Sequence, residues 1–411
     1  TPNIDKLASQ GMLFTNAHAN AVVCNPSRTS VMTGLLPSTT GIYMNAHHPF
    51  EDHIPDVVPL PQQLRENGYT TTCINKVFHG REPKPASWDK FIKVQEKVNV
   101  VEGTRVIINR SVRWAELEGP DNKIGDVSSA LKAARFLQKE YEKPFFLALG
   151  ITRPHEPLFA PTRFYDMYPL DEITMPNVLE NDLNDVPKLG KNLAAAYSLE
   201  PELDDPEMKP RIVQAYLASV SFVDYCVGLA IDGLAKGPNA DNTIVVLWSD
   251  HGMHLGEKDH WSKMALWEED TRVPLIITGP GIAPQGAKCD RVVSLIDLYP
   301  TLAESCGIPA PASLDGRSLL PLFENPERAW DYPAISTHGK NNHAVRTEGW
   351  RYIRYNDGAE ELYDRSNDPY EWKNLAKQAS SAATKEKLKA LLPTLNAEPP
   401  ANMHRKSGKS Q

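Results

Sequence analysis

The hydrophobic positions of the chain fall into short continuous runs that alternate with amphipathic stretches. Strand-like apolar runs occur at residues 69–74, 144–150, 243–248 and 273–278. Stretches with helical spacing occur at residues 60–67, 128–141 and 211–236. Continuous apolar strands separated by helices are typical of a mostly parallel central sheet that is sandwiched by helices. We therefore predict an α/β fold with buried strands, whose chemistry lies at the carboxyl ends of those strands.

The pattern changes near residue 326, where short segments replace the long runs. Strand-like segments lie at residues 334–337, 343–346, 350–355 and 361–363, and a helical pattern follows near residues 384–392. These segments predict a small C-terminal antiparallel sheet with one helix. We expect an α/β domain over residues 1–325, a subdomain over residues 326–398 and a disordered polar tail over residues 399–411.

Composition narrows the classes of function. The 411 residues are 41% hydrophobic and 23% charged, as in an ordinary globular protein. The net charge of −8 gives no basic signature, so no nucleic-acid partner is expected, and an anionic ligand needs a local basic pocket. The five cysteines do not suggest a disulfide framework. The chain has no run of about 18 apolar residues, so we expect no membrane span.

Cys24 opens the most informative motif, Cys-Asn-Pro-Ser-Arg-Thr-Ser. The pattern predicts a helix from Thr29 to Leu36, and the free N–H groups at its start favour an anion. Arg28 lies about one helical turn from Cys24, where it can hold an anion or a modified side chain by paired hydrogen bonds. A buried structural cysteine is the commonest alternative, and a thiol nucleophile with a lowered pKa is another.

Asp250 and His251 follow the strand that ends at Trp248. Their oxygen and nitrogen atoms could face a single cation on one tight turn, although an ordinary Asp-capped turn is the simpler interpretation. Lys263 follows the same loop. A lone lysine is mostly a surface charge, but this one lies between a glycine-containing loop and the next strand.

Basic side chains also follow two other predicted strands. Lys76 and His79 come after the strand that ends at Ile74, and His155 comes after the strand that ends at Gly150. Each could be an ordinary turn residue or a structural histidine. Because the carboxyl ends of such strands carry the chemistry of the fold, we expect the basic residues to act together on one anion.

These motifs, in this order, resemble the type I sulfatases of the alkaline phosphatase superfamily. The resemblance extends from Thr1 to about Leu375, and its most specific parts are residues 24–30 and 249–263. Within the family, the segments Lys-Val-Phe-His at 76–79 and Arg-Pro-His at 153–155 are most similar to iduronate-2-sulfatases and their bacterial relatives.

The resemblance implies the hydrolysis of sulfate esters. Cys24 would be oxidised by a formylglycine-generating enzyme, and the hydrate of the resulting formylglycine would attack sulfur. Asp250, His251 and the modified Cys24 would bind one Ca²⁺, and Arg28 would orient the attacking hydroxyl. In the family a strand that ends in a metal-binding Asp-Asp pair precedes the segment at residues 1–5. We therefore expect this sequence to be a piece of a longer protein.

The remaining roles also follow from the resemblance. Lys76 and Lys263 would bind the sulfuryl oxygens, and His155 would be the general acid for the leaving sugar oxygen. His79 would either deprotonate the second hydroxyl or bind sulfate. Asp364 matches a turn in the C-terminal hairpin of the family and has a structural role.

A sulfated carbohydrate is the implied substrate, and a 2-O-sulfated uronate is the best match to the subgroup. The loops at residues 43–56 and 171–210 would shape its pocket, and His47 and His48 could contact a carboxylate or sulfate. The resemblance further implies a periplasmic or extracellular enzyme. Three alternatives stay open: a phosphodiesterase or phosphonate hydrolase of the same superfamily, a non-catalytic glycan-binding member, and a hydrolase that uses the Cys24 thiol itself.

Overall fold

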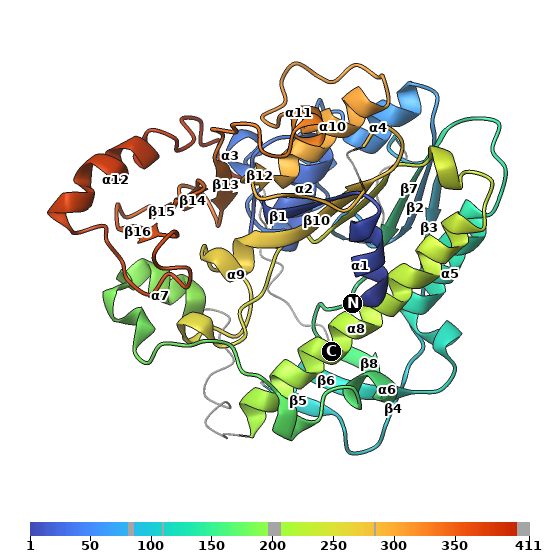
Figure 1. Cartoon of the computed structure of the whole chain (residues 1–411), viewed down its shortest axis with the longest axis horizontal. Coiled ribbons are helices and arrows are strands. Elements are labelled where there is room, and N and C mark those ends of the chain that lie inside the picture. Colours follow the sequence, from blue (N-terminus) through green and yellow to red (C-terminus); the bar gives the residue numbers. More distant parts are fainter. Residues whose placement is uncertain (81–85, 109–110, 196–206, 283–284, 401–411) are drawn as a thin grey trace.

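The computed structural model describes residues 1–80, 86–108, 111–195, 207–282 and 285–400. Two sheets lie at the centre of its α/β region (Figure 1). The first has the strand order β11-β1-β10-β9, with β12 also paired to β1, and the second has the order β3-β2-β7. The strands of the first sheet are β1 (Met12–His18), β9 (Val245–Trp248), β10 (Arg272–Thr278), β11 (Ala287–Cys289) and β12 (Val293–Ser294). Those of the second are β2 (Thr70–Asn75), β3 (Lys90–Ile92) and β7 (Phe145–Gly150).

The pairing directions confirm a mostly parallel arrangement. Among the described residues, four of the six pairings in these two sheets are parallel: β1 with β11 and β12, and β2 with β3 and β7. β10 is antiparallel to both of its neighbours, β1 and β9. The hydrophobic pattern could not show this reversal, because a strand that is buried on both faces is apolar whichever way it runs.

One expectation about burial is wrong. The apolar run at residues 243–248 was expected to be a fully buried strand, but β9 is only half-buried at each of its four positions. The reason lies in the strand order, since β9 ends its sheet and pairs only with β10 within the described ranges. β7 also ends its sheet, and three of its first four residues are half-buried. The apolar runs therefore predicted the positions of these strands correctly, but the strands are less buried than we expected.

Helices cover both faces of the sheets (Figure 1). α1 (Pro2–Ser9), α5 (Gly125–Leu137) and α8 (Met208–Ala235) pack together on one side. α2 (Cys24–Thr33), α4 (Leu60–Glu66) and α10 (Leu298–Ser305) pack together on the other. Ile74 of β2, Ala133 of α5 and Ala230 of α8 form one buried cluster, which fixes the first helix group against the second sheet. The helices predicted from the pattern are thus confirmed, with ends that differ by a few residues.

α8 is long and apolar enough to cross a membrane by length and composition alone. However, 61% of its apolar window is buried inside the protein, where α8 packs against α1 and α5. Burial of this extent is typical of the central helix of a globular domain. Among the described residues, α8 is therefore a core helix by its burial, and the absence of a membrane span stays a prediction.

A further small sheet was not predicted. It consists of β4 (Asn99–Val100), β5 (Val106–Ile108), β6 (Ser111–Glu118) and β8 (Leu158–Pro161), and β6 pairs with all three of the others. Three of its strands have only two to four residues, and β6 pairs with β8 from a distant part of the chain, so the local pattern marks them weakly. The sheet packs beside α8. Its strand β8 begins three residues after His155.

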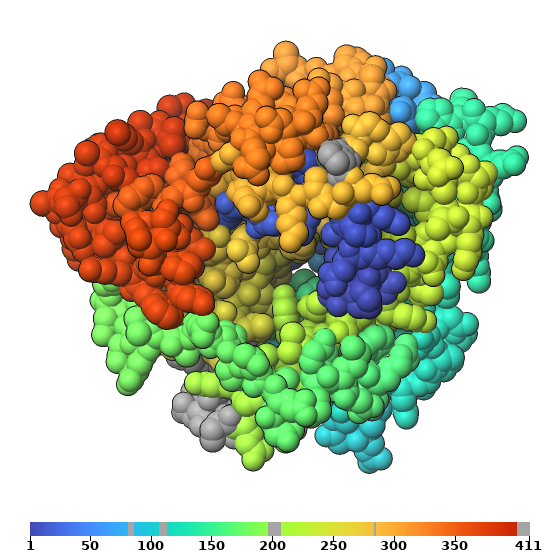
Figure 2. Space-filling view, viewed as in Figure 1, coloured from blue at the N-terminus to red at the C-terminus, as the bar shows by residue number. Residues whose placement is uncertain are grey.

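The surface excursion expected at residues 171–210 is confirmed over its described part, and residues 196–206 lie outside that part. It contains the short turns η4 (Leu170–Glu172) and η5 (Asp182–Asp185) and the helix α7 (Lys188–Ala195). Figure 2 shows this green segment beside the red C-terminal subdomain. Asn177 Nδ2 donates to the Tyr370 hydroxyl at 2.8 Å, and the Asn374 N–H donates to Asp185 Oδ2 at 2.8 Å.

The C-terminal subdomain has the predicted antiparallel sheet and helix. The sheet consists, in chain order, of β13 (Ala334–Thr337), β14 (His343–Arg346), β15 (Trp350–Arg354) and β16 (Glu360–Asp364), and α12 (Ala382–Lys389) follows it. Asp364 accepts hydrogen bonds from the Ser366 N–H and from Asn367 Nδ2, and it so closes the turn after β16. The boundary at residues 325–326 remains our proposal, and residues 401–411 of the predicted tail lie outside the described residues.

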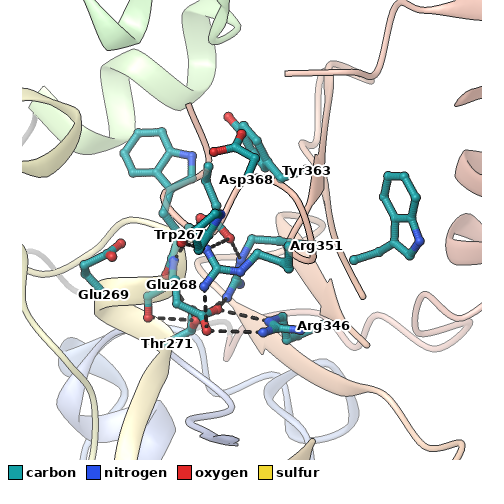
Figure 3. Close-up of polar contacts among 12 residues, drawn as sticks. Trp267, Glu268, Glu269, Thr271, Arg346, Arg351, Tyr363 and Asp368 are labelled. Atoms are coloured by element: carbon teal, nitrogen blue, oxygen red, sulfur yellow. Dashed lines mark hydrogen bonds and ion pairs between the residues drawn. The ribbon is translucent and has the colours of Figure 1, made fainter. Parts of the chain in front are cut away.

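A buried ion-pair network joins this subdomain to α9 (Glu268–Thr271) of the α/β region (Figure 3). Glu268 accepts hydrogen bonds from Arg346 at 3.1 Å and from Arg351, and Arg351 also pairs with Glu371 at 2.5 Å. Arg351 is 0% exposed. Because removal of one member of such a network leaves a buried charge unpaired, the network holds α9 firmly against the subdomain.

Candidate active site

Cys24 is the first residue of α2, so the helix begins five residues before the predicted start at Thr29. Pro26 is tolerated in the first turn, because N–H groups there have no partner within the helix. The helix ends at Thr33 rather than at Leu36, because Gly34 adopts the left-handed conformation with φ 68°. The Cys24 side chain is buried, and it points from the N-terminus of α2 toward His251 and Lys263.

Four of the predicted site residues meet at the Cys24 sulfur. Cys24 Sγ lies 3.3 Å from His251 Nε2 and 3.2 Å from Lys263 Nζ. Lys263 Nζ lies 3.3 Å from His155 Nε2 and 3.3 Å from His251 Nε2. Burial alone would raise the pKa of the Cys24 thiol, but His155, His251 and His79 around the sulfur outweigh burial and lower that pKa far below its ordinary value. The pocket therefore stabilises negative charge at the side chain of residue 24.

Asp250 and Arg28 form an ion pair behind this centre. Arg28 Nε donates to Asp250 Oδ2 at 2.7 Å, and its Nη1 donates to the carbonyl oxygens of Lys76 and Val77, each at 2.9 Å. Burial would raise the pKa of the Asp250 carboxyl, but the charge of Arg28 lowers it below its usual range. Within the described residues, Arg28 makes no hydrogen bond with Cys24. Its contacts instead align the end of β9 with the end of β2.

Lys76 reaches the site because β2 and β7 end in close contact. Asn75 adopts the left-handed conformation with φ 62°, and its Nδ2 donates to the Gly150 carbonyl oxygen at 3.2 Å. A Cβ atom on residue 150 would lie 2.0 Å from the Lys76 carbonyl oxygen, so only glycine fits there. Burial lowers the pKa of Lys76, while the negative charge of Cys24 opposes that shift.

His155 lies on a turn that Asp126 holds in place. Asp126, at the start of α5, accepts from the Thr152 N–H at 2.8 Å and from the Arg153 N–H at 3.1 Å. His155 Nδ1 lies 2.6 Å from the Glu156 carbonyl oxygen and donates to it, because a carbonyl can only accept. The Nε2 atom of His155 is thereby free to face Lys263 and the pocket. The sequence did not indicate Asp126, since it is distant from the turn along the chain.

The remaining candidate histidines lie to one side of Cys24. The rings of His48 and His79 contact each other edge to face, with centroids 5.3 Å apart. His79 Nδ1 is buried and has no hydrogen-bond partner in the part of the chain that the structure describes. His47 is buried and accepts a hydrogen bond from the Tyr43 N–H at 3.0 Å, which is a structural contact. His48 and His79 therefore remain candidates for contact with substrate.

The residues that could hold a cation lie together. Cys24, Asp250 and His251 each offer one ligand atom, and these atoms lie within 4.8 Å of one another. His251 Nδ1 donates to the Gly252 carbonyl oxygen at 2.9 Å, which leaves Nε2 facing the centre, as in many metal-binding histidines. Ca²⁺ takes six to eight ligands that are mostly oxygen atoms. Of these three atoms only the Asp250 carboxylate is an oxygen, so the group fits a metal ion in general, and Asp250 alone among the three suits Ca²⁺.

The α/β fold and the site together indicate a hydrolytic enzyme of the alkaline phosphatase superfamily. The sulfatase family model matches residues 1–308. A model described as the C-terminal part of N-sulphoglucosamine sulphohydrolase matches residues 256–398. The chain therefore belongs to the sulfatase family and is a sulfuric ester hydrolase.

Individual proteins agree with the family assignment. A sulfatase of Formosa agariphila is 42% identical over 97% of this chain and 82% of its own length. Iduronate 2-sulfatase of Mus musculus is 33% identical over 76% of this chain, which spans 65% of that relative. A solved structure in complex with D-glucosamine-2-N,6-O-disulfate has a TM-score of 0.77 and 23% identity, and the match covers 95% of this chain and 91% of that one. This last likeness supports the fold alone.

Proposed function

We propose that this sulfatase hydrolyses sulfate esters of a carbohydrate, using a formylglycine formed from Cys24 and one bound Ca²⁺. The position of the Cys24 sulfur, 3.3 Å from His251 Nε2 and 3.2 Å from Lys263 Nζ, supports this most strongly. In formylglycine an oxygen atom takes the place of this sulfur on the same carbon atom. In that form residue 24 would supply a hydrated aldehyde as nucleophile, and the cation held by Asp250 and His251 would polarise it.

The two lysines bind the sulfate group in this proposal. Lys263 Nζ lies within hydrogen-bond distance of Cys24 and His155, so a sulfate placed against residue 24 would contact its ammonium group. Lys76 approaches from the end of β2, on the side of Arg28. Two positive charges in a largely buried pocket stabilise the charge that develops on the sulfuryl oxygens.

His155 and His79 handle protons in this proposal. In this proposal His155 acts as an imidazolium: its Nδ1–H stays bonded to the Glu156 carbonyl oxygen, and its Nε2–H passes its proton to the leaving sugar oxygen, which leaves a neutral ring. His79, whose Nδ1 has no partner within the described ranges, either takes the proton of the second hydroxyl or binds the sulfate. Arg28 supports the centre by holding Asp250 ionised and aligned.

A 2-O-sulfated uronate is the proposed substrate. The 33% identity with an iduronate 2-sulfatase supports it, as do the paired rings of His48 and His79 beside the pocket. The overall charge of −8 makes such a local basic surface necessary for an anionic sugar. We further propose that a formylglycine-generating enzyme matures the protein and that it acts in the periplasm or outside the cell.

The test compares wild type with Cys24→Ala and with a matched control, Cys226→Ala. Cys226 is equally buried but belongs to α8, which contributes no residue to the centre around Cys24 described above. Protein is matured by co-expression with a formylglycine-generating enzyme, and desulfation is measured on defined oligosaccharides. We expect no turnover with Cys24→Ala, an unchanged melting temperature for it, and near-normal turnover with Cys226→Ala. Turnover by Cys24→Ala would refute the proposed nucleophile.

The same preparations separate the alternatives. Preference for phosphate diesters or phosphonate esters over sulfate esters would identify the related hydrolase of the superfamily. Binding of sulfated oligosaccharide without turnover would identify a non-catalytic member. An intact thiol at Cys24 in the mass spectrum of active enzyme would identify a thiol hydrolase, which the lowered pKa of Cys24 would also suit.

A further inference from the structure

A second cluster of polar side chains lies behind the candidate active site. His254, His260 and Asp270 are each fully buried, and one polar atom of each lies within 4.8 Å of the others. The first two follow His251 along the same loop, and Asp270 belongs to α9. We call these three residues the buried histidine cluster. None of them makes a hydrogen bond with Cys24 among the described residues.

The side chains of the cluster bind the backbone that directly follows the Lys263 Cα atom. His260 Nε2 donates to the carbonyl oxygen of Lys263 at 3.0 Å. Asp270 Oδ2 accepts from the Ala265 N–H at 2.6 Å, and Asp270 Oδ1 accepts from His254 Nδ1 at 2.8 Å. His260 and Asp270 therefore hold the two ends of residues 263–265, His254 holds Asp270, and the side chain of Lys263 at the start of this segment reaches Cys24.

The backbone of this segment has a conformation that it would not adopt alone. Met264, next to Lys263, has φ 89°, in the left-handed region that non-glycine residues avoid. Such a conformation persists only where surrounding contacts impose it. The loop before it is closed by hydrogen bonds from the His254 N–H to the Ser262 carbonyl oxygen at 2.9 Å and from the Gly256 N–H to the His260 carbonyl oxygen at 3.0 Å.

α9 provides a fixed support for these contacts. Figure 3 shows Glu268 directed toward the arginines of the C-terminal subdomain, whereas Glu269 points away from them. Glu269 Oε2 lies 3.7 Å from His254 Nε2, so it adds negative charge to the cluster. The carbonyl oxygens of Glu269 and Asp270 accept from the N–H groups of Met253 and Gly252 at 3.0 and 2.8 Å. One short helix thus holds both the Asp250–His251 turn and the Lys263 segment.

We propose that His254, His260 and Asp270 are positioning residues that set the Lys263 ammonium group against residue 24 and the sulfate. A lysine side chain has many rotamers, and its position depends on where the backbone places its Cα atom. Small displacements in an active site lower rates strongly, by about 100-fold for 1 Å. The inference rests on the proposed role of Lys263 in binding sulfate.

The test is a double-mutant cycle between residues 260 and 263, with kcat and KM measured on 4-nitrophenyl sulfate. His260→Phe keeps an aromatic ring but loses the donor to the Lys263 carbonyl oxygen, and His260→Gln offers a replacement donor. We expect His260→Phe to lower kcat/KM by about 100-fold in wild type. It should have almost no further effect in the Lys263→Ala background, and His260→Gln should retain most activity. Asp270→Asn replaces His260→Phe in the cycle if that variant does not fold.

The control is His343→Phe, because His343 is a buried histidine of the C-terminal subdomain that bonds Thr337 and Asn396. Its effect on kcat/KM, whatever its size, should be the same in both backgrounds. If His260→Phe lowers kcat/KM by the same factor in wild type and in the Lys263→Ala background, the positioning role is overturned. The proposed role of Lys263 itself would not be affected by that result. Normal turnover by Lys263→Ala would overturn the proposed role of Lys263 and the inference with it.

Discussion

The charge of His254 makes a prediction about stability that follows directly from its surroundings. Burial by itself would lower the pKa of His254, but Asp270 at 2.8 Å and Glu269 at 3.7 Å outweigh burial. The result is a pKa raised from 6.5 to about 9. Because the side chain is fully buried, solvent does not screen these interactions.

The size and direction of the effect can be worked out. Each unit of pKa shift corresponds to about 1.4 kcal/mol, so the shift of His254 corresponds to about 3 kcal/mol of folding free energy. The folded state binds the proton more tightly than the unfolded state. The stabilisation is therefore complete below pH 6.5 and is lost as the pH rises from 6.5 to about 9.

The assay is urea unfolding followed by tryptophan fluorescence, in wild type and His254→Gln, at several pH values between 6 and 9.5. Glutamine can still donate a hydrogen bond to Asp270 but carries no charge. We expect the difference in unfolding free energy between the two proteins to shrink by about 3 kcal/mol across this range. His343→Gln is the control, because burial lowers the pKa of His343 and its contribution should not decline above pH 6.5. A difference for His254→Gln that is independent of pH would refute the charged state of His254.

Three other substitutions test the architecture of the site. Gly252→Ala places a Cβ atom 1.8 Å from the Glu269 carbonyl oxygen, so we expect a loss of about 1–3 kcal/mol in urea unfolding together with lower turnover. Arg351→Met leaves Glu268 and Glu371 buried without their main partner, and should cost about 3–5 kcal/mol; a smaller loss than for Gly252→Ala would contradict the network. Asp250→Asn should weaken Ca²⁺ binding in a calorimetric titration and lower turnover, and an unchanged affinity would contradict its role as a ligand.

Much of the fold could be predicted from local pattern. The strands β2, β7 and β10 and the helices α5 and α8 lie where apolar runs and helical spacing indicated them. The antiparallel pairing of β10 and the half-exposure of β9 could not be predicted in this way. Both depend on which strand lies alongside, and that choice is made by residues far away in the sequence.

The sequence indicated which residues the candidate site contains, but it did not indicate which of them contact each other. Lys76, His155 and Asp250 were recognised because each follows a strand, where an α/β sheet places its chemistry. The contacts of Arg28 with Asp250 and with two carbonyl groups of the segment after β2 were not visible, because these groups come from three separate segments. Asp126 could not be recognised from the sequence, because its contacts with residues 152 and 153 join parts of the chain that are distant from each other.

The sequence by itself determined the chemistry that is available, namely a cysteine at a helix start, basic residues at strand ends and an Asp-His pair after another strand. These properties are local, because helix starts and strand ends follow from neighbouring residues. Only the tertiary structure decided that Lys263, His251 and Cys24 lie within 3.3 Å of one another. It also decided that α9 supports them from behind, because such contacts depend on the packing of distant segments, which no local pattern records.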